Sequence, residues 1–578
     1  MNNQKGLLSK DDIQFLKRTT LLIIFLTVSL IYLYIGKSVS YERYERVSFQ
    51  SSGVTLYANL YYPSKEIDIQ EKSPLIIYCH GIGSQRDFDL RIPIEFTKRG
   101  FYIAALDYQG HGESGGNIDN INPSNHIPAL AQDCSKLLDK LETLPFYSNV
   151  NTSQIGLIGH SLGGMVVLMN QALDSRFNIT VAWAPLVNFV PQQMGIFNVA
   201  GFEPYIPVNL INSTNTFNLL IIMHVNDEAL DFSSQALVAQ NLTGCTVIPI
   251  TEPLIGGGHQ LFTDRVIIES INWFESYFFH SETINGPIRI TFIVNYIVIF
   301  ISLGLLVLII LNLIAYTSKF FVVKQETKRK ILLSNKVRAS FPRKFSEIFQ
   351  IFVYTSIFLL NWQLFERFFG FLGIFFASLN ITIIYLTFKL IRYLKRLRED
   401  KVRFDWVELK ELIKAEFKLR YLLYVLLCNF YFIGIYLIFS FSYPFAFMWP
   451  SNYLSHALIA DVAFPVYFSM ELLFRKVIYP RLSFLKEERK KTIWLLLIIF
   501  YIYINLMTLT WSWSFFPSVM FMYFILLYTS IQNTIIYENT QKFSTVILSS
   551  FNIVQLFFAA VISNALGIGS ALHLFVGL

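Results

Sequence analysis

Long apolar segments fill the chain from residue 289 onward. Eight such segments follow one another, at about 289–316, 348–365, 368–391, 421–443, 455–474, 493–510, 516–536 and 544–567. An α-helix needs about 20 apolar residues to cross the hydrocarbon core of a bilayer. Because backbone groups exposed to lipid must satisfy their own hydrogen bonds, we expect an all-α polytopic transmembrane domain of about eight spans over residues 289–578.

A further apolar segment lies near the beginning of the chain. Residues 19–36 read TTLLIIFLTVSLIYLYIG, which raises the expected number of spans to roughly nine. Four basic residues precede this segment: Lys5, Lys10, Lys17 and Arg18. Since basic residues flank the cytoplasmic ends of spans, residues 1–18 are predicted to be cytoplasmic. No small-x-small cleavage site follows, which favours an uncleaved anchor over a signal peptide.

Basic loops between the apolar segments give an independent check on orientation. Residues 319–344, 392–403 and 475–491 are rich in lysine and arginine. All three loops fall on the cytoplasmic side when the spans are counted from the N-terminus, as the positive-inside rule requires. The sequence therefore predicts a multi-pass protein of the cell membrane with residues 40–285 outside the cytoplasm.

Residues 40–285 have the character of a soluble domain, with turns that separate short apolar runs. Six runs are predicted to be buried strands: 75–79, 101–107, 154–159, 179–184, 218–225 and 245–250. Helical patterns such as 128–144 and 162–173 fall between them. This alternation predicts an α/β domain with a doubly wound, mostly parallel sheet. Residues 47–62 alternate around Ser-Ser-Gly, which predicts an antiparallel hairpin that leads into the sheet.

Residues 155–165, IGLIGHSLGGM, contain a serine flanked by glycines. Gly159, Ser161 and Gly163 lie where a predicted strand meets a predicted helix, which is the context of a nucleophile elbow. The serine in such a turn has a strained backbone, and the following helix adds N–H groups and a positive dipole end that favour an oxyanion. A turn that only joins strand to helix would have the same pentapeptide, so this pattern alone leaves both interpretations open.

Two further residues stand where a serine nucleophile needs its partners. Asp227 follows the predicted strand 218–225, and His259 lies in a glycine-rich loop before a helical segment. A serine hydroxyl requires a general base, and the base requires an acid that fixes its tautomer. The order Ser, Asp, His is that of the α/β-hydrolase class, which takes a second oxyanion donor from a loop after an earlier strand. The loop His80–Gly83 follows the strand 75–79 in this way.

Five short motifs occur in order along residues 45–280. They are H-G-I-G-S at 80–84, D-Y-Q-G-H-G-E-S at 107–114, G-H-S-L-G-G at 159–164, H-V-N-D-E-A-L at 224–230 and G-G-H at 257–259. With these motifs the region resembles the α/β-hydrolase superfamily, in particular its monoglyceride-lipase-like and aminopeptidase-like serine hydrolases. The resemblance implies these roles: Ser161 as nucleophile, His259 as base, Asp227 as orienting acid, and the backbone N–H groups of Leu162 and Ile82 as oxyanion hole. Asp231 is an alternative acid.

Several other polar residues of this domain have structural explanations. His80, His111 and His160 belong to the motif turns and are expected to stabilise loops, and His224 is expected to pack near the end of a strand. The four cysteines have no CxxC spacing, and the histidines and carboxylates have no ligand spacing. We therefore expect neither a metal nor a cofactor.

The segment 185–217 lies where hydrolases of this superfamily insert a cap over the active site. It is rich in Phe, Val, Ile and Pro. An apolar lid beside a bilayer suggests an acyl ester, a lipid or a hydrophobic peptide as substrate. A small cap packed onto its own domain would have the same composition, so both interpretations remain open.

One charged pair interrupts the apolar segments. Glu471 and Arg475 lie within one helical turn near the inner end of a predicted span, and charge inside a membrane is a functional-site hypothesis by default. With its neighbours the pair resembles the Glu-Glu-x-x-x-Arg motif of the CAAX-type intramembrane protease family. Met470 replaces the first glutamate, and no histidine stands at residues 500–505 or 549–554, so the resemblance implies a degenerate, non-catalytic domain. An ion pair of Glu471 with Arg475 or a neighbour is the simpler alternative.

These features together predict a membrane-tethered serine hydrolase that cleaves an ester, or an amide or peptide bond, on the outer face of the membrane. Its substrate is a small molecule, a lipid or a peptide, and membrane lipid surrounds its helical half. Two other functions fit the same features: a receptor or transporter whose hydrolase-like domain only binds a ligand, and an intramembrane protease that uses the C-terminal domain. The basic loops account for the net charge of +7, so nucleic acid is not an expected partner, and oligomeric state is left open.

Overall fold

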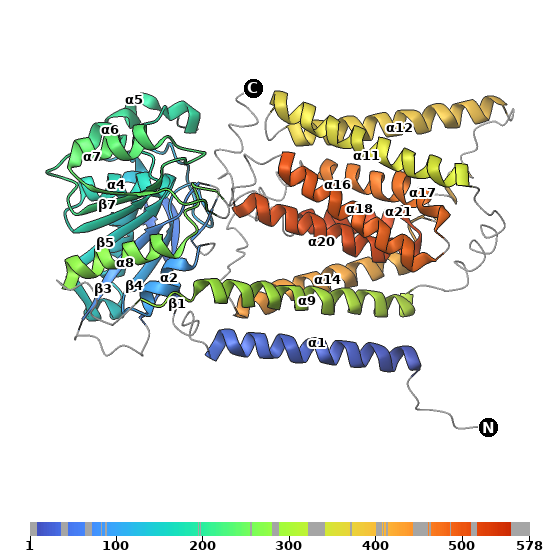
Figure 1. The fold of residues 1–578 in the computed structure, drawn as a ribbon, viewed down its shortest axis with the longest axis horizontal. Coiled ribbons are helices and arrows are strands. Elements are labelled where there is room, and N and C mark those ends of the chain that lie inside the picture. The colour runs from blue at the N-terminus through green and yellow to red at the C-terminus, as the bar shows by residue number, and fades with distance from the viewer. Residues whose placement is uncertain are drawn as a thin grey trace.

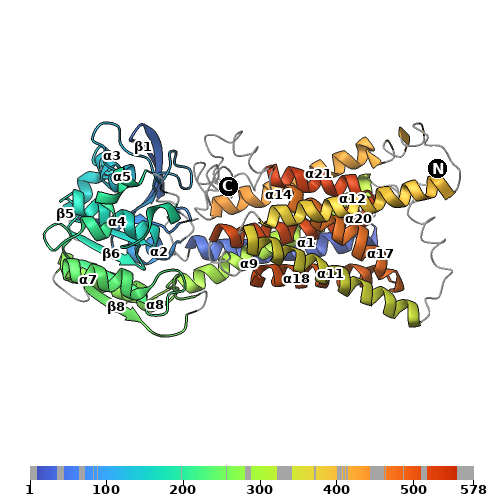
Figure 2. The ribbon, with the colours of Figure 1, turned by 90° about the horizontal axis from the view of Figure 1, so that it is seen from above.

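The computed structural model has a sheet domain at one end and a bundle of long helices at the other (Figures 1 and 2). It describes residues 9–35, 44–63, 72–279, 288–321, 341–369, 373–399, 416–442, 461–509 and 517–555, apart from 83, 87, 88, 195, 197, 255, 256, 462, 463 and 486, and also the single positions 407, 410, 411 and 414. The sheet domain and the bundle meet at the beginning of helix α9 (Phe292–Phe321), which runs from the sheet domain along the bundle.

Eight strands form one mixed sheet. They are β1 (Tyr44–Ser51), β2 (Val54–Tyr61), β3 (Ser73–Cys79), β4 (Tyr102–Asp107), β5 (Val150–His160), β6 (Ile179–Trp183), β7 (Leu219–His224) and β8 (Thr246–Ile250). Their order in the sheet is β1-β2-β4-β3-β5-β6-β7-β8. β1 pairs with β2 and β2 pairs with β4, both antiparallel. All other pairings, from β4 with β3 to β7 with β8, are parallel.

Helices cover both faces of the sheet, which explains why its central strands are continuously apolar. Every residue of β3, β4, β6 and β7 is buried. The helices α2 (Arg91–Thr97) and α8 (Asp264–Phe279) pack on one face, and α3 (Asp133–Leu141) and α4 (Leu162–Leu173) pack mainly on the other. The edge strand β1 instead alternates between buried and exposed residues over its second half.

The α/β-hydrolase fold expected for this domain is confirmed. All six predicted strands are present as β3 to β8, the predicted hairpin is formed by β1 and β2, and the helix predicted over 162–173 is α4. The segment 128–144 differs in detail, because a short 3-10 turn (Ala129–Ala131) precedes α3. The four cysteines are free and buried, as expected for core residues.

The second part of the molecule consists of helices and short connections over its described residues. Its elements are α1 (Lys10–Ile35), α9, α11 (Phe341–Phe369), α12 (Gly373–Glu399), α14 (Leu419–Ser442), α16 (Phe464–Glu471), η9 (Leu472–Ile478), α17 (Tyr479–Arg481), η10 (Leu482–Phe484), α18 (Glu488–Leu509), α20 (Pro517–Thr540) and α21 (Phe543–Ile553). Among the residues that the structure describes, four stretches are long and apolar enough to cross a membrane: 12–32, 292–321, 345–369 and 375–395. They support a membrane protein. The number of about nine spans stays a prediction, and the last predicted span, 544–567, extends past the described residues.

The two helices that flank the sheet domain in sequence pack side by side (Figure 1). Asn312 of α9 donates a hydrogen bond to Thr19 of α1 at 2.8 Å. One turn further along, the rings of Tyr316 and Phe15 stack with centroids 3.9 Å apart. Because the residue numbers of the two helices run in opposite directions along this contact, α1 and α9 are antiparallel.

Candidate active site

Ser161 occupies the sharp turn between β5 and α4. Its backbone has φ 54° and ψ −117°, a conformation that costs a non-glycine residue on the order of 1–3 kcal/mol and persists only where its surroundings enforce it. Gly163 lets the backbone after Ser161 approach the end of β3, because a Cβ at this position would overlap the carbonyl oxygens of Cys79 and His80. The beginning of α4 therefore lies against the end of β3, and the turn stands at the carboxyl edge of the sheet.

His259 joins Ser161 and Asp227 in one hydrogen-bonded row. Its Nε2 lies 2.9 Å from Ser161 Oγ, and its Nδ1 lies 2.8 Å from Asp227 Oδ2 and 3.0 Å from Oδ1. An ionised carboxylate only accepts hydrogen bonds, so Nδ1 carries the proton and Nε2 is left to accept one from the serine. Ser161 is 4% exposed and His259 is 8% exposed. The row has the geometry of a nucleophile, a general base and an acid that orients the base.

The carboxyl group of Asp227 is held in its ionised form. Burial alone would raise its pKa, but the hydrogen bond with His259 and the backbone N–H groups of Leu230 and Ala229 outweigh burial and lower the pKa. Both N–H groups donate to Oδ1, at 2.9 Å and 2.8 Å. Asp227 therefore keeps its charge at neutral pH and fixes the tautomer of His259.

Asp231, the alternative acid, has a different position. Its carboxylate accepts a hydrogen bond from the backbone N–H of Ser234 at 2.8 Å, and its side chain is exposed. This contact lies in the first turn of the short helix η6 (Ser233–Leu237). Of the two predicted acids, Asp227 is the one that contacts His259.

Two backbone segments border Ser161. Gly81 lies against it, since a Cβ on Gly81 would be 3.4 Å from the Cβ of Ser161. Ile82 follows in the turn after β3 and is half-buried, and Leu162 is the first residue of α4. The structure thus brings both segments that carry the predicted oxyanion donors to the serine. A helix N-terminus presents N–H groups without intrahelical partners, which suits a developing oxyanion.

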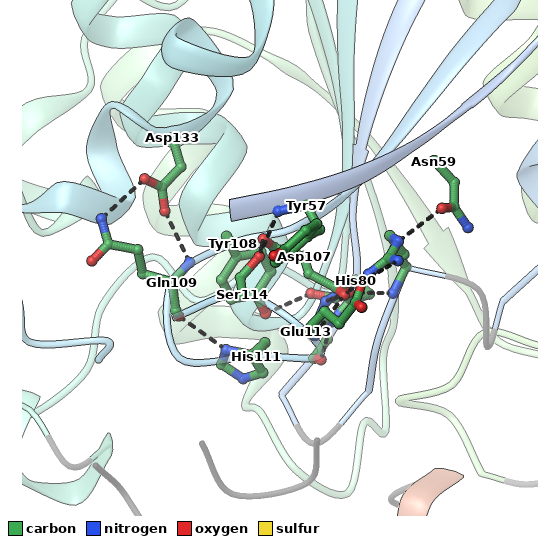
Figure 3. A network of polar contacts seen from close by, with 12 residues as sticks. Tyr57, Asn59, His80, Asp107, Tyr108, Gln109, His111, Glu113, Ser114 and Asp133 are labelled. Carbon is green, nitrogen blue, oxygen red and sulfur yellow. Dashed lines mark hydrogen bonds and ion pairs between the residues drawn. The ribbon is translucent and has the colours of Figure 1, made fainter. Parts of the chain in front are cut away.

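A buried ionic network supports the loop after β3 (Figure 3). The carboxylate of Asp107, at the end of β4, accepts the backbone N–H of Arg86 at 2.7 Å, forms an ion pair with its guanidinium, and lies 3.3 Å from His80 Nε2. The same guanidinium pairs with Glu113 at 2.9 Å. Burial alone would raise the pKa of Asp107, but Arg86 and His80 lower it to about 2. The network therefore ties the loop that holds Ile82 to the loop after β4.

His160, next to Ser161, contacts the backbone of His259. Burial and the neighbouring His259 lower the pKa of His160 to about 3, so its ring is neutral at physiological pH. Its Nε2 lies 2.8 Å from the carbonyl oxygen of His259. Since a carbonyl only accepts, Nε2 of His160 is the donor. The expectation that His160 stabilises a loop is confirmed, and the loop is the one that contains His259.

Sequence reasoning missed two charged residues that hold the same loop. Glu228 accepts the backbone N–H of Gly258 at 2.8 Å and that of His259 at 3.3 Å. Arg91 donates from Nη1 to the carbonyl oxygen of Leu261 at 2.7 Å. The sequence could have indicated Glu228, because this residue directly follows Asp227 in the motif at 224–230. No such indication existed for Arg91, because 170 positions separate it from its partner.

The segment 185–217 packs onto its own domain. It forms the short helices η4 (Pro191–Met194), α5 (Val199–Phe202), η5 (Glu203–Tyr205) and α6 (Pro207–Leu210). Phe202 and Ile206 are buried in the core formed with α3 and α4. Of the two interpretations of its apolar composition, packing on the domain accounts for these side chains.

Glu471 and Arg475 lie inside the helical bundle. Arg475 Nε is 3.0 Å from Glu471 Oε2, and both side chains are buried. Asn533 of α20 donates to Glu471 Oε1 at 2.9 Å and to Ser550 of α21 at 2.8 Å. The ion pair offered as the simpler explanation of this motif is therefore present, while the resemblance to an intramembrane protease stays a prediction.

The fold and the site define a hydrolase-like domain of the α/β-hydrolase class on a chain with helices that can cross a membrane. Residues 70–211 match the model of the family described as "Serine aminopeptidase, S33". This matched segment contains Ser161 and both segments that border it, and it ends before Asp227 and His259.

Sequence relatives include acetylhydrolases and an uncharacterised protein. The platelet-activating factor acetylhydrolase of Cavia porcellus is 25% identical over 172 residues, which cover 22% of this chain and 39% of the relative. An uncharacterised 31.7 kDa protein of Escherichia coli, from the traX-finO intergenic region, is 34% identical over 113 residues, which cover 19% of this chain and 37% of that protein. The chain thus spans less than half the length of these curated relatives.

Solved structures of similar fold include an esterase and a peptidase. Acetyl xylan esterase 1 from Thermoanaerobacterium sp. JW/SL YS485 has a TM-score of 0.31 and 19% identity, over 44% of this chain and 93% of that one. The acylaminoacyl peptidase of Pyrococcus horikoshii has a TM-score of 0.33 and 15% identity, over 41% of each chain.

Proposed function

We propose that the chain is a serine hydrolase that acts on the outer face of the cell membrane. Ser161 is the nucleophile, His259 is the general base and Asp227 is the acid that orients His259. The observation that carries this proposal is the hydrogen-bonded row itself, with 2.9 Å from Ser161 Oγ to His259 Nε2 and 2.8 Å from His259 Nδ1 to Asp227 Oδ2. In the reaction His259 takes the serine proton as Oγ attacks the carbonyl carbon of the substrate. His259 then returns the proton to the leaving group.

The oxyanion that forms on attack is assigned to the backbone N–H groups of Leu162 and Ile82. Each such donor contributes about 3 kcal/mol to transition-state stabilisation in enzymes of this kind. The network of Asp107 and Arg86 supports this role, because it fixes the loop in which Ile82 lies. Water then releases the acyl group from Ser161, again with His259 as base.

An ester is the bond we propose as substrate, in preference to a peptide. Relatives named platelet-activating factor acetylhydrolase occur in several animals, and the family model is described as a serine aminopeptidase. A site beside apolar helices that can span a membrane favours an acyl ester over a polar peptide.

The test uses the full-length protein in lipid nanodiscs. A fluorophosphonate probe should label the wild type, and p-nitrophenyl acetate and butyrate should be turned over faster than peptide p-nitroanilides. Ser161→Ala should abolish labelling and lower kcat/KM to below about one thousandth of the wild type. Ser276→Ala, which removes an exposed serine hydroxyl of α8, is the matched control and should leave both unchanged.

Two results would favour the other functions. Folded wild-type protein that does not react with the probe would indicate a domain that only binds its ligand. Hydrolysis that survives Ser161→Ala but is lost in Glu471→Gln would indicate a protease site in the helical bundle.

A further inference from the structure

The beginning of α9 is bound by a residue of the hydrolase-like domain. Glu95 of α2 accepts the backbone N–H groups of Thr291 at 2.9 Å and Phe292 at 2.7 Å. Its second carboxylate oxygen pairs with Lys98 at 2.9 Å, and the side chain is only 2% exposed. A carboxylate at a helix N-terminus satisfies N–H groups that have no partner in the helix and favours the helix dipole. The first turn of a helix that can span a membrane is thus capped from the catalytic domain.

Tyr296 makes a second contact one turn further along α9. Its hydroxyl oxygen accepts the backbone N–H of Leu90, the residue before α2, at 3.0 Å. Its ring centroid lies 6.1 Å from that of Phe262, and the ring of Phe292 lies 5.4 Å from the same phenylalanine. Phe262 is three residues beyond His259, so α9 contacts the loop of the base directly.

Arg91 connects α2 to the loop of the base. Its guanidinium is fixed by Asp89, with 2.6 Å between Nη2 and Oδ2, and lies 5.1 Å from the ring centroids of both Trp183 and Phe262. Because Arg91 directly follows Leu90, the hydrogen bond that Leu90 N–H donates to Tyr296 holds the residue beside Arg91. With these contacts the guanidinium faces the loop after His259, where it reaches the carbonyl oxygens of Gln260 and Leu261.

Each residue of this loop from 258 to 261 has a backbone N–H or carbonyl group that is hydrogen-bonded to a side chain from elsewhere in the domain. The contacts are Glu228 with the N–H groups of Gly258 and His259, His160 with the carbonyl of His259, and Arg91 with the carbonyls of Gln260 at 3.3 Å and Leu261 at 2.7 Å. The loop contains Gly257 with φ +94°, and glycine backbones have many accessible conformations. Contacts from side chains outside this loop are therefore needed to hold His259 in place.

We infer that the first two turns of α9 form part of the catalytic site as a positioning element, which keeps His259 within hydrogen-bond reach of Ser161 through Glu95, Tyr296 and Arg91. The inference rests on the proposed function. A general base acts only within hydrogen-bond reach of the proton it takes, and a displacement of about 1 Å can cost about 100-fold in rate. Turnover at the sheet edge therefore depends on the docking of a membrane helix.

The test compares full-length variants in nanodiscs with p-nitrophenyl acetate, with kcat divided by the number of sites that the fluorophosphonate titrates. Tyr296→Phe removes the hydroxyl that binds Leu90 and keeps the ring, and Tyr316→Phe makes the same change near the far end of α9. Glu95→Ala removes the cap of α9, whereas Glu95→Gln keeps an oxygen that can accept the same N–H groups.

The expected result is a fall of kcat per titrated site of about tenfold in Tyr296→Phe and Glu95→Ala, with KM unchanged. Glu95→Gln should recover most of this loss, and Tyr316→Phe should match the wild type. A role in folding alone would lower the number of titrated sites and leave kcat per site intact.

Three outcomes overturn the inference. They are kcat per site within twofold of the wild type in Tyr296→Phe, a rise of KM with constant kcat, and an equal loss in Tyr316→Phe. If Glu95→Ala does not fold, the single-hydroxyl change in Tyr296→Phe still decides the question. Failure of the proposed function is distinct, because wild-type protein would then not be labelled at all.

Discussion

At the scale of single residues, the site depends on buried charges that are paired. Asp107 is fully buried and stays ionised because Arg86 and His80 face it. Removing one partner of such a pair leaves an uncompensated charge in a medium of low polarity, which is strongly destabilising. The loop after β3 is therefore held by a network whose strength depends on the protonation of the carboxylate of Asp107.

This network predicts how the stability of the sheet domain depends on pH. The folded-state pKa of Asp107, about 2, lies below the ordinary value of 3.8, so its contribution is fully present above pH 4 and is lost as pH falls towards 2. The shift corresponds to about 2–3 kcal/mol. Hydrogen exchange in β4, followed by mass spectrometry between pH 5 and 2, should show this loss. Asp107→Asn should have a smaller pH slope, and an unchanged slope would contradict the assignment.

At the scale of elements, the cap is a set of short helices that share the core of the sheet. Phe202 is fully buried, whereas Val190 in the same segment is 51% exposed. An element this short is stabilised by its side chains in the core rather than by its own backbone hydrogen bonds. The cap is therefore part of the domain fold and packs in the core formed with α3 and α4.

Truncation of Phe202 tests this description of the cap. Phe202→Ala should lower the free energy of unfolding of the domain by about 3–5 kcal/mol, because it removes a buried ring and leaves a cavity. Val190→Ala should stay within about 0.5 kcal/mol of the wild type. Urea-dependent hydrogen exchange of α4 and β5 peptides measures both variants. A similar small effect of the two substitutions would indicate a cap that is only loosely attached.

At the scale of the whole molecule, the proposed topology places the catalytic domain outside and the basic loops inside. The antiparallel pair α1 and α9 fits this arrangement, since it holds both ends of the sheet domain on the same side of the bundle. The contacts of α9 with Leu90, α2 and Phe262 place the carboxyl edge of the sheet at the end of the sheet domain that meets the helical bundle.

Single cysteines report this topology. Ser148→Cys lies on the surface of the sheet domain, and Lys395→Cys lies near the end of α12, where the lysine side chain is 72% exposed. A membrane-impermeant maleimide should label the first in intact cells and the second only after permeabilisation. The four native cysteines are buried and give little background. Labelling in the reverse order would invert the predicted orientation.

The sequence alone determined the class of fold and the three residues of the hydrogen-bonded row. Continuous apolar runs identify buried parallel strands, and the carboxyl ends of such strands meet at one sheet edge, so motifs that follow those strands come together without any knowledge of side-chain packing. Ser161, Asp227 and His259 could be found in this way.

The tertiary structure decided what holds that row in place. Arg91 is 170 positions from Leu261, and Glu95 is 196 positions from Thr291. Neither residue lies in a recognisable motif, because its role depends on how α2 and α9 pack against the sheet rather than on local pattern. Periodicity and motifs specify which residues reach the edge of a sheet, whereas the orientation of packed helices decides which distant side chains fix them there.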